Sequence, residues 1–188
     1  MSSHHIVREK QEPALLVLGL NNFNDDELGQ LLEWSPTVIA DAYTAEQLIA
    51  YGIKVDYVVG NDELRLQANT RLIAMVNDNV VETALNFLII NGYPAVNIVT
   101  DDFYAVQYFK FASQINIVIF YNRKKTYAIT SGFTKWKPAG EEISVLTESE
   151  LQLTGLTKVS VGTYFTTNDG FFSLRFNEDF IFISENLY

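Results

Sequence analysis

The first two thirds of the chain repeat one pattern: a short apolar run, a polar break and a segment with apolar residues at helical spacing. Runs such as residues 14–20 (ALLVLGL) and 115–121 (INIVIFY) are apolar at almost every position, which is typical of strands buried on both faces. Strands that alternate with helices favour a mostly parallel sheet with helices on both sides. We therefore expect a three-layer α/β domain over residues 12–122.

Polar residues mark the ends of the elements in this domain. The expected strands are residues 14–20, 37–40, 57–60, 72–76, 96–100 and 115–121. Helices are expected after the first, second, fourth and fifth of these strands, the last two helices at 80–91 and 103–112. Asp25 or Asp26 is a candidate cap for the first helix and Asp41 or Thr44 for the second, because such side chains accept hydrogen bonds from free N–H groups. Gly52 is expected to end the second helix.

The pattern changes at the turn-like basic stretch of residues 122–125 (NRKK), after which no helical period is found. The expected strands are then residues 126–130, 142–146, 151–156, 159–165, 170–176 and 180–184. Asp169-Gly170, between β-prone flanks, indicates a hairpin. Short strands at this spacing predict an antiparallel β-sandwich domain over residues 123–188.

The charge of the chain excludes one class of partner. The net charge is −10, and a field of that sign repels phosphate backbones, so we expect no nucleic-acid partner. A small anionic nucleotide could still bind with help from backbone N–H groups or a metal ion. Because the chain has no Cys and its apolar runs are too short to span a bilayer, we expect a cytoplasmic protein without disulfides or a membrane partner.

The residues that follow the expected strands are mostly Asp and Asn. In an open α/β sheet, ligands bind beyond the carboxyl ends of the strands, so these residues are candidate cofactor ligands. They are Asn21, Asn22, Asp41, Asn61, Asp62, Glu63, Asn77, Asp78, Asp101 and Asp102. An acidic rim suits Mg²⁺; the alternative is that these residues cap helices and form turns. No Lys or Arg follows these strands, so a phosphate would depend on a metal ion or on backbone amides.

Other templates for chemistry are missing or weak. The chain contains no P-loop and no GxGxxG motif, and its only histidines are His4 and His5, so a Ser-His-Asp arrangement is impossible in the body of the protein. Trp136, in the loop-like Lys135-Trp136-Lys137, is a candidate to stack on a ligand ring; the alternative is a partly buried packing residue.

The segments around the strand ends, taken in order, resemble the thiamin pyrophosphokinases. Residues 38–45 (VIADAYTA), 52–56 (GIKVD) and 58–60 (VVG) resemble that family's apolar strand with D-G-G-A-N, its G-I-x-P-D and the strand before its G-D-F-D-S. Further matching segments are residues 82–88, 92–93, 96–99, 140–146 (G-x-x-I-S-L-x-P), 154–156 and 166–168 (S-x-S-N). The match covers most of the chain and agrees with a two-domain organisation.

The resemblance implies an enzyme that binds ATP and Mg²⁺ on the α/β domain and transfers a pyrophosphoryl group to thiamin at a homodimer interface. On this reading the catalytic residues are Asp41, Asp62 and Glu63, and Asp78 joins them around Mg²⁺. The cofactor-binding residues are Asn21, Asn22, Gly60, Asn61, Asp101 and Asp102. The substrate-binding residues are Trp136, Ser144, Thr167 and Asn168. Phosphoryl transfer needs such carboxylates to hold the metal across the phosphates.

The chain also departs from the family at its chemical motifs. D-G-G-A-N has become residues 41–45 (DAYTA), in which both glycines are lost and Tyr43 would obstruct close backbone approach. G-D-F-D-S has become residues 60–64 (GNDEL), with Asn61 in place of the first metal ligand. G-G-R-x-D-H has become residues 100–103 (TDDF), without its Arg and His. We therefore expect a homodimeric protein with weakened, altered or absent catalysis that binds a thiamin-like molecule or a nucleotide; the alternative is a non-catalytic binding or interaction module.

Overall fold

The computed structural model describes residues 12–61, 69–75 and 77–187, and these form two compact units, 1–117 and 118–188. In the first unit all strands from β1 to β5 are parallel, in the order β5-β1-β2-β3-β4. Their bounds are β1 Ala14–Val17, β2 Val38–Asp41, β3 Tyr57–Gly60, β4 Arg71–Ala74 and β5 Ala95–Val99. The parallel sheet is thus confirmed. Because β1 lies between β5 and β2 and all four of its residues are buried, an unbroken apolar run is required there.

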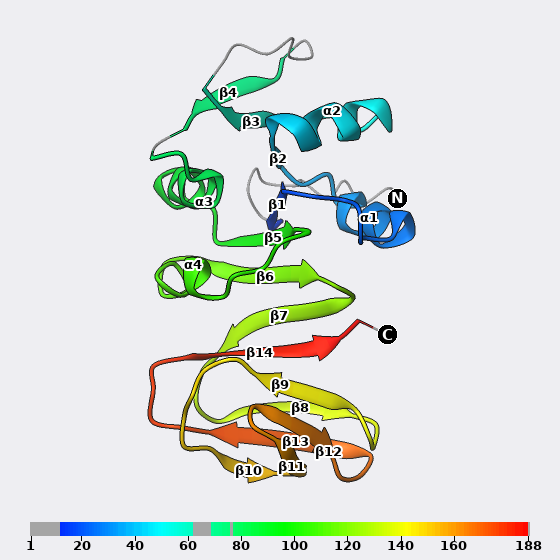
Figure 1. Ribbon diagram of the computed structural model, residues 1–188, viewed down its shortest axis with the longest axis vertical. Helices are drawn as coiled ribbons and strands as arrows, with labels where there is room; N and C mark the ends of the chain where they lie inside the picture. The colour runs from blue at the N-terminus through cyan, green and yellow to red at the C-terminus, as the bar shows by residue number, and fades with distance from the viewer. Residues whose placement is uncertain (1–11, 62–68, 76, 188) are drawn as a thin grey trace, which may run out of the picture. The chain divides into compact units, whose positions relative to one another are not determined.

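The described residues of this unit form four helices: α1 Asp25–Leu32, α2 Ala42–Ala50, α3 Val80–Ile90 and the single turn α4 Val106–Phe109. Crossovers between parallel strands are right-handed, and β1 to β4 advance in one direction across the sheet whereas the return to β5 reverses it. This places α1 and α2 on one face and α3 on the other. In Figure 1, α1 and α2 accordingly lie to the right of the strands and α3 to the left.

The observed helix ends correct two predictions. Asn24, not Asp25 or Asp26, caps α1, because Asn24 has extended dihedral angles and its side chain accepts from the Asp26 N–H at 2.8 Å. The helix expected over residues 103–112 is reduced to α4, since residues 102–104 are irregular and Phe103 stacks on Tyr108 with ring centroids 5.7 Å apart. Gly52 ends α2 as predicted, with a φ of +76° that favours glycine.

The second unit holds antiparallel strands from two sheets. Strands β11-β12-β9-β14-β7-β6 follow one another in the larger sheet, and β10-β13-β8 form a three-stranded sheet. The bounds are β6 Asn116–Tyr121, β7 Lys124–Ile129, β8 Phe133–Lys137, β9 Glu142–Val145, β10 Gln152–Thr154, β11 Leu156–Ser160, β12 Thr163–Thr166, β13 Gly170–Arg175 and β14 Ile181–Asn186. Asn122 and Arg123 both have positive φ and form the two-residue turn of the β6–β7 hairpin.

Three predictions for the second unit are wrong. Asp169-Gly170 does not close a hairpin: β12 and β13 belong to different sheets, and the Asp169 side chain instead accepts from the Ala139 N–H at 2.8 Å. Trp136 lies on strand β8, which the sequence pattern missed, and not in a loop. The strand expected at residues 159–165 contains the turn between β11 and β12, where Gly162 has a φ of +72°.

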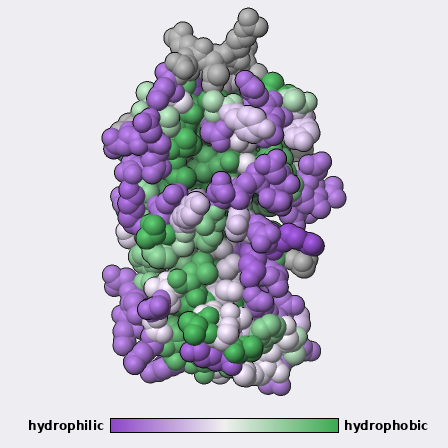
Figure 2. Space-filling view, in the orientation of Figure 1, coloured by the Kyte–Doolittle hydropathy of each residue, from purple (hydrophilic) through white to green (hydrophobic). Residues whose placement is uncertain are grey.

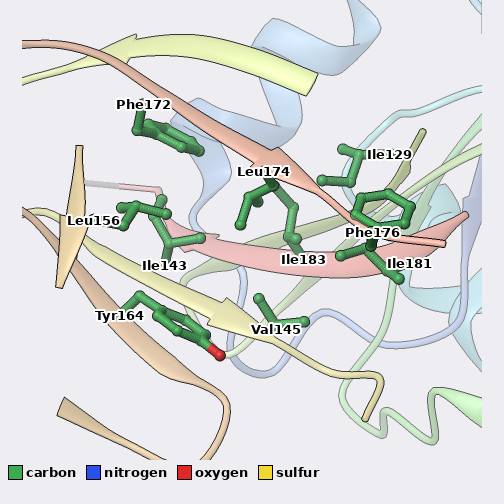
Figure 3. Close-up of a cluster of buried hydrophobic side chains, with 10 residues drawn as sticks. All are labelled: Ile129, Ile143, Val145, Leu156, Tyr164, Phe172, Leu174, Phe176, Ile181 and Ile183. Carbon is green, nitrogen blue, oxygen red and sulfur yellow. The ribbon is translucent and has the colours of Figure 1, made fainter. Parts of the chain in front are cut away.

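The core of the second unit lies between its two sheets (Figure 3). Phe172 and Leu174 from β13 face Ile143 from β9 and Ile183 from β14, and all four side chains are almost fully buried. Burial of this apolar surface is the main stabilising contribution to the unit. In the part of the chain that the structure describes, no helix is long and apolar enough to cross a membrane.

Candidate functional site

The predicted cofactor residues follow parallel strands and therefore lie at one edge of the sheet in the first unit. The structure brings three of them into contact. Asp101, just after β5, binds Asn21 and Asn22 in the loop after the neighbouring strand β1. This loop begins where Leu18 N–H donates to the Val99 carbonyl at 2.8 Å, which extends the pairing of the two strands.

The Asp101 carboxylate accepts four hydrogen bonds from this loop. Oδ2 accepts from the Asn21 backbone N–H at 3.1 Å and from Asn21 Nδ2 at 2.8 Å. Oδ1 accepts from the Asn22 backbone N–H at 3.1 Å and from Asn22 Nδ2 at 3.4 Å. Hydrogen bonds to an ionised acceptor are stronger than those between neutral groups, so Asp101 ties the two strand-end loops together.

Gly19 provides the space for this contact. A Cβ atom at Gly19 would lie 2.3 Å from Asp101 Oδ2 and 2.9 Å from the Asp101 backbone nitrogen. Real Cβ atoms do not approach other atoms so closely. Glycine is therefore required at this position for a steric reason, because any side chain would displace the Asp101 carboxylate.

Asp41, the acid at the end of β2, serves as the N-cap of α2. Oδ1 accepts from the Thr44 N–H at 2.8 Å and Oδ2 from the Thr44 hydroxyl at 2.9 Å. Both carboxylate oxygens thus have a local partner, as expected for a residue that starts a helix. Tyr43 beside it is 69% exposed, so its side chain is not packed into the strand-end loops.

The other predicted residues at this edge are scattered. Gly60 is buried in β3, and Asn61 after it is exposed. Asp78 is exposed and, like Asn77, has a positive φ in the turn before α3, whereas Asp102 is exposed and has its backbone N–H bonded to Thr100 Oγ1. The predicted catalytic and metal residues Asp62 and Glu63 lie outside the described residues.

The described residues do not fit a magnesium site on their own. Within residues 12–61, 69–75 and 77–187, no three acidic or His side chains come together in an arrangement that could hold a metal ion. The oxygens of Asp41 and Asp101 already accept hydrogen bonds from Thr44, Asn21 and Asn22. We therefore derive no catalytic step through a metal ion.

The predicted substrate residues lie on different faces of the second unit. Trp136 alternates with the inward-facing Lys135 on β8 and is 53% exposed on the outer face of the small sheet, beside Phe171. Ser144 alternates with the buried Ile143 on β9 and so lies on the outer face of the large sheet. The core lies between these two faces, so one ligand cannot contact both residues within one chain.

Thr167 and Asn168 are exposed in the connection between β12 and β13. The Thr167 N–H donates to the Gly155 carbonyl at 3.0 Å, and Asn168 Nδ2 donates to the Thr167 hydroxyl at 3.2 Å. The neighbouring Thr166 hydroxyl, which is buried, donates to the Pro138 carbonyl at 2.6 Å. These bonds hold the connection in place while leaving Thr167 and Asn168 accessible.

A buried charged cluster in the second unit was missed by the sequence patterns. Glu185 on β14 has a side chain only 4% exposed, yet it contacts Lys135, Lys137 and Tyr127. Lys135 donates to Oε1, the Tyr127 hydroxyl donates to the same oxygen at 3.2 Å, and Lys137 Nζ lies 3.0 Å from Oε2. The Lys137–Oε2 contact is a charge interaction and lacks hydrogen-bond geometry, because Oε2 has no aligned donor among the described residues. We name Glu185, Lys135, Lys137 and Tyr127 the Glu185 cluster.

Charge sets the protonation of this cluster. Burial acts to raise the pKa of Glu185, but the hydrogen bond from Lys135 and the positive charges of Lys135 and Lys137 outweigh it and hold that pKa below its usual value. Burial, together with the adjacent Glu185 carboxylate, raises the pKa of the Tyr127 hydroxyl far above its usual range. Glu185 is therefore ionised and Tyr127 neutral near pH 7. No local sequence signal identifies the cluster, because its members come from three separate strands.

No family model matches the chain, and no curated protein matches it. Solved structures do match. A protein from Lactobacillus plantarum is 12% identical, with 93% of this chain and 98% of that one covered at a TM-score of 0.70. Thiamine pyrophosphokinase from Bacillus subtilis is 12% identical, with 94% of this chain and 100% of that one covered at a TM-score of 0.67. Thiamin pyrophosphokinase from Candida albicans is 10% identical, with 93% of this chain and 90% of that one covered at a TM-score of 0.67.

This chain has the thiamin pyrophosphokinase fold. The agreement extends over both units and nearly the whole length of each matched protein, so it includes the parallel sheet and the antiparallel strands together. It confirms the resemblance that the strand-end segments indicated. At 10–14% identity the match establishes the fold alone, so activity must be argued from the residues of this chain.

Proposed function

We propose that this protein is a thiamin pyrophosphokinase-like protein with degenerate catalytic motifs, which binds a thiamin-like molecule or a nucleotide and transfers little or no pyrophosphate. The observation that carries the proposal is the state of Asp41 on this fold. Both of its oxygens accept hydrogen bonds from Thr44, so the acid that survives from the family's D-G-G-A-N motif acts as a helix cap. The lost glycines and the Asn at position 61 support the same conclusion.

If pyrophosphoryl transfer does persist, Asp41, Asp62, Glu63 and Asp78 are the side chains that would hold Mg²⁺ beside ATP. The metal would neutralise charge on the phosphates. Trp136, Thr167 and Asn168 would then contact the thiamin-like ligand, and Ser144 would do so from the second copy of a homodimer. A dimer is the arrangement that lets residues on opposite faces of the second unit take part in one site.

Catalysis and binding are separated by two measurements on the full chain. A coupled assay for AMP release with thiamin, ATP and Mg²⁺ is expected to show no turnover above background. Thermal unfolding with thiamin at about 100 times its Kd is expected to raise Tm by roughly 5–10 °C, because a ligand that binds only the folded state stabilises it. Turnover that D41N abolishes would overturn the loss of catalysis.

A second candidate is an interaction module that keeps the fold for its surface. It is favoured by Trp136 and Phe171, which pair across β8 and β13 and are 53% and 69% exposed. Figure 2 shows that hydrophobic residues also reach the surface among hydrophilic ones on the face drawn. Aromatic side chains of this kind are enriched in protein interfaces. On this candidate, neither thiamin nor ATP shifts Tm at millimolar concentration, and W136S lowers the mass measured by light scattering.

A further inference from the structure

The loop after β1 presents a group of hydrogen-bond donors that one anion already occupies. The backbone N–H groups of Asn21 and Asn22, joined by both side-chain amides, all point to the carboxylate of Asp101. Consecutive backbone N–H groups that converge on one point form an anion-binding concavity, as in phosphate-binding loops. Asp101 supplies the anion from within the chain.

The fit between the loop and Asp101 is close. Each carboxylate oxygen accepts from the backbone and from the side chain of one Asn, so the two oxygens have separate pairs of donors. Gly19 leaves room for Oδ2, which a Cβ atom at that position would approach to 2.3 Å. The loop is therefore shaped around a carboxylate in this position.

Electrostatics also act against a second anion at this edge. A phosphate would need the same N–H groups, and it would meet the negative charge of Asp101 at hydrogen-bond distance from them. Among the described residues that directly follow the strands of the parallel sheet there is no Lys or Arg to offset that repulsion, and the net charge of the chain is −10.

We infer that Asp101 is an internal ligand of this loop and excludes phosphate groups from the strand-end site. The exclusion rests on the proposed function, because it concerns the site where that fold would place a nucleotide. It sharpens the ligand class: a molecule that binds at this edge with Asp101 in place is neutral or cationic. Thiamin-like cations meet this requirement, and nucleotide phosphates do not.

The inference is tested with inorganic phosphate as the probe and the full chain labelled with ¹⁵N. Phosphate is titrated into the wild type, D101N and D101G, and the amide resonances of Asn21 and Asn22 are followed. D101N keeps the size of the side chain and removes its charge, whereas D101G removes both the charge and the side chain. D25N is the matched control, because Asp25 is an exposed acid three residues after Asn22 and its change alters net charge equally.

The expected result is tighter phosphate binding at Asn21 and Asn22 in both Asp101 variants. If Asp101 occupies the loop at least nine-tenths of the time, its removal increases phosphate affinity about tenfold or more, since apparent affinity scales with the competent fraction. D25N should bind phosphate as weakly as the wild type. Equal affinity in wild type and D101N would overturn the inference, as would a folded D101G whose Asn21 and Asn22 resonances do not respond to phosphate.

Failure of this inference can be told apart from failure of the proposed function. Thiamin binding, followed by Tm on the wild type, tests the proposed function and does not depend on the Asp101 variants. If thiamin does not raise the Tm of the wild type but D101N binds phosphate more tightly than the wild type, the internal ligand is supported and the proposed function is contradicted. D101G provides a second variant without the charge, and the amide spectrum of each variant shows whether it is folded before phosphate is added.

Discussion

The acidic residues of the two units differ in what surrounds them. At the strand-end edge of the first unit, Asp41 and Asp101 are half-buried and accept hydrogen bonds from a nearby helix start and a neighbouring loop. In the second unit, Glu185 is 4% exposed and compensated by two lysines. In the first unit, where the sequence predicts catalytic acids, Asp41 caps a helix and Asp101 joins two loops, whereas the buried carboxylate that lysines compensate lies in the antiparallel second unit.

Among the tests of this contrast, removal of the Glu185 charge is expected to have the largest effect on stability. E185Q removes the buried carboxylate that Lys135 and Lys137 share and leaves Lys137 with its longer, 3.8 Å contact to Glu141. Breaking a buried pair costs about 3 kcal/mol of unfolding free energy. Urea denaturation measures this loss of unfolding free energy. The matched control is E142Q, because the Glu142 side chain is 30% exposed and that of Glu185 only 4%, and exposed pairs contribute about 1 kcal/mol or less. Equal losses in the two variants would remove the distinction between the sites.

Acid pH should weaken the same cluster. The folded-state pKa of Glu185 is lowered, so its contribution to stability is fully present above the unfolded pKa and is lost as pH falls through the folded value. Denaturant unfolding curves measured from pH 7 down to pH 3 should therefore show a smaller acid loss in E185Q than in the wild type. This difference in acid loss cannot exceed the loss of unfolding free energy that E185Q causes at pH 7. Equal losses of stability in both proteins as pH falls would show that other carboxylates dominate the acid dependence.

Gly19 tests how closely the strand-end loops of the first unit are fitted. G19A places a Cβ against the Asp101 carboxylate and backbone, and overpacking of this kind costs about 1–3 kcal/mol. G29A is the control, because Gly29 lies in α1 with open space around it and alanine there is expected to gain roughly 0.5–1 kcal/mol. Thermal unfolding of the two variants should move in opposite directions. If G19A left the unfolding temperature unchanged, the two strand-end loops would separate readily.

Asp41 carries the smallest expected effect. D41A removes the cap of α2 and should cost about 1 kcal/mol, as for other N-cap substitutions to alanine. N79A, at the cap of α3, provides the comparison, because Asn79 accepts from the Glu82 N–H at 2.9 Å in the same way. Chemical denaturation should give similar losses for both. A stability gain in D41A would instead mark Asp41 as a strained functional acid and would restore it as a catalytic candidate.

Much of the fold could be predicted because it depends on local rules. The apolar run at β1 and the Asp41 cap follow from burial and from hydrogen bonding within a few residues of the chain. The errors occurred where distant partners compete with local signals. Asp169 binds the Ala139 N–H, so Asp169-Gly170 connects two sheets in place of a hairpin, and β8 completes a sheet around Trp136.

By itself, the sequence determined the parallel sheet, the resemblance to the thiamin pyrophosphokinases and the loss of their chemical motifs. These follow from periodicity and from residue identity along the chain. The tertiary structure alone decided which acids have partners. Asp101 meets Asn21 across 80 positions, and Glu185 meets Lys135 across 50. Such pairs depend on strand order and register, and neither can be read from the spacing of residues within one segment.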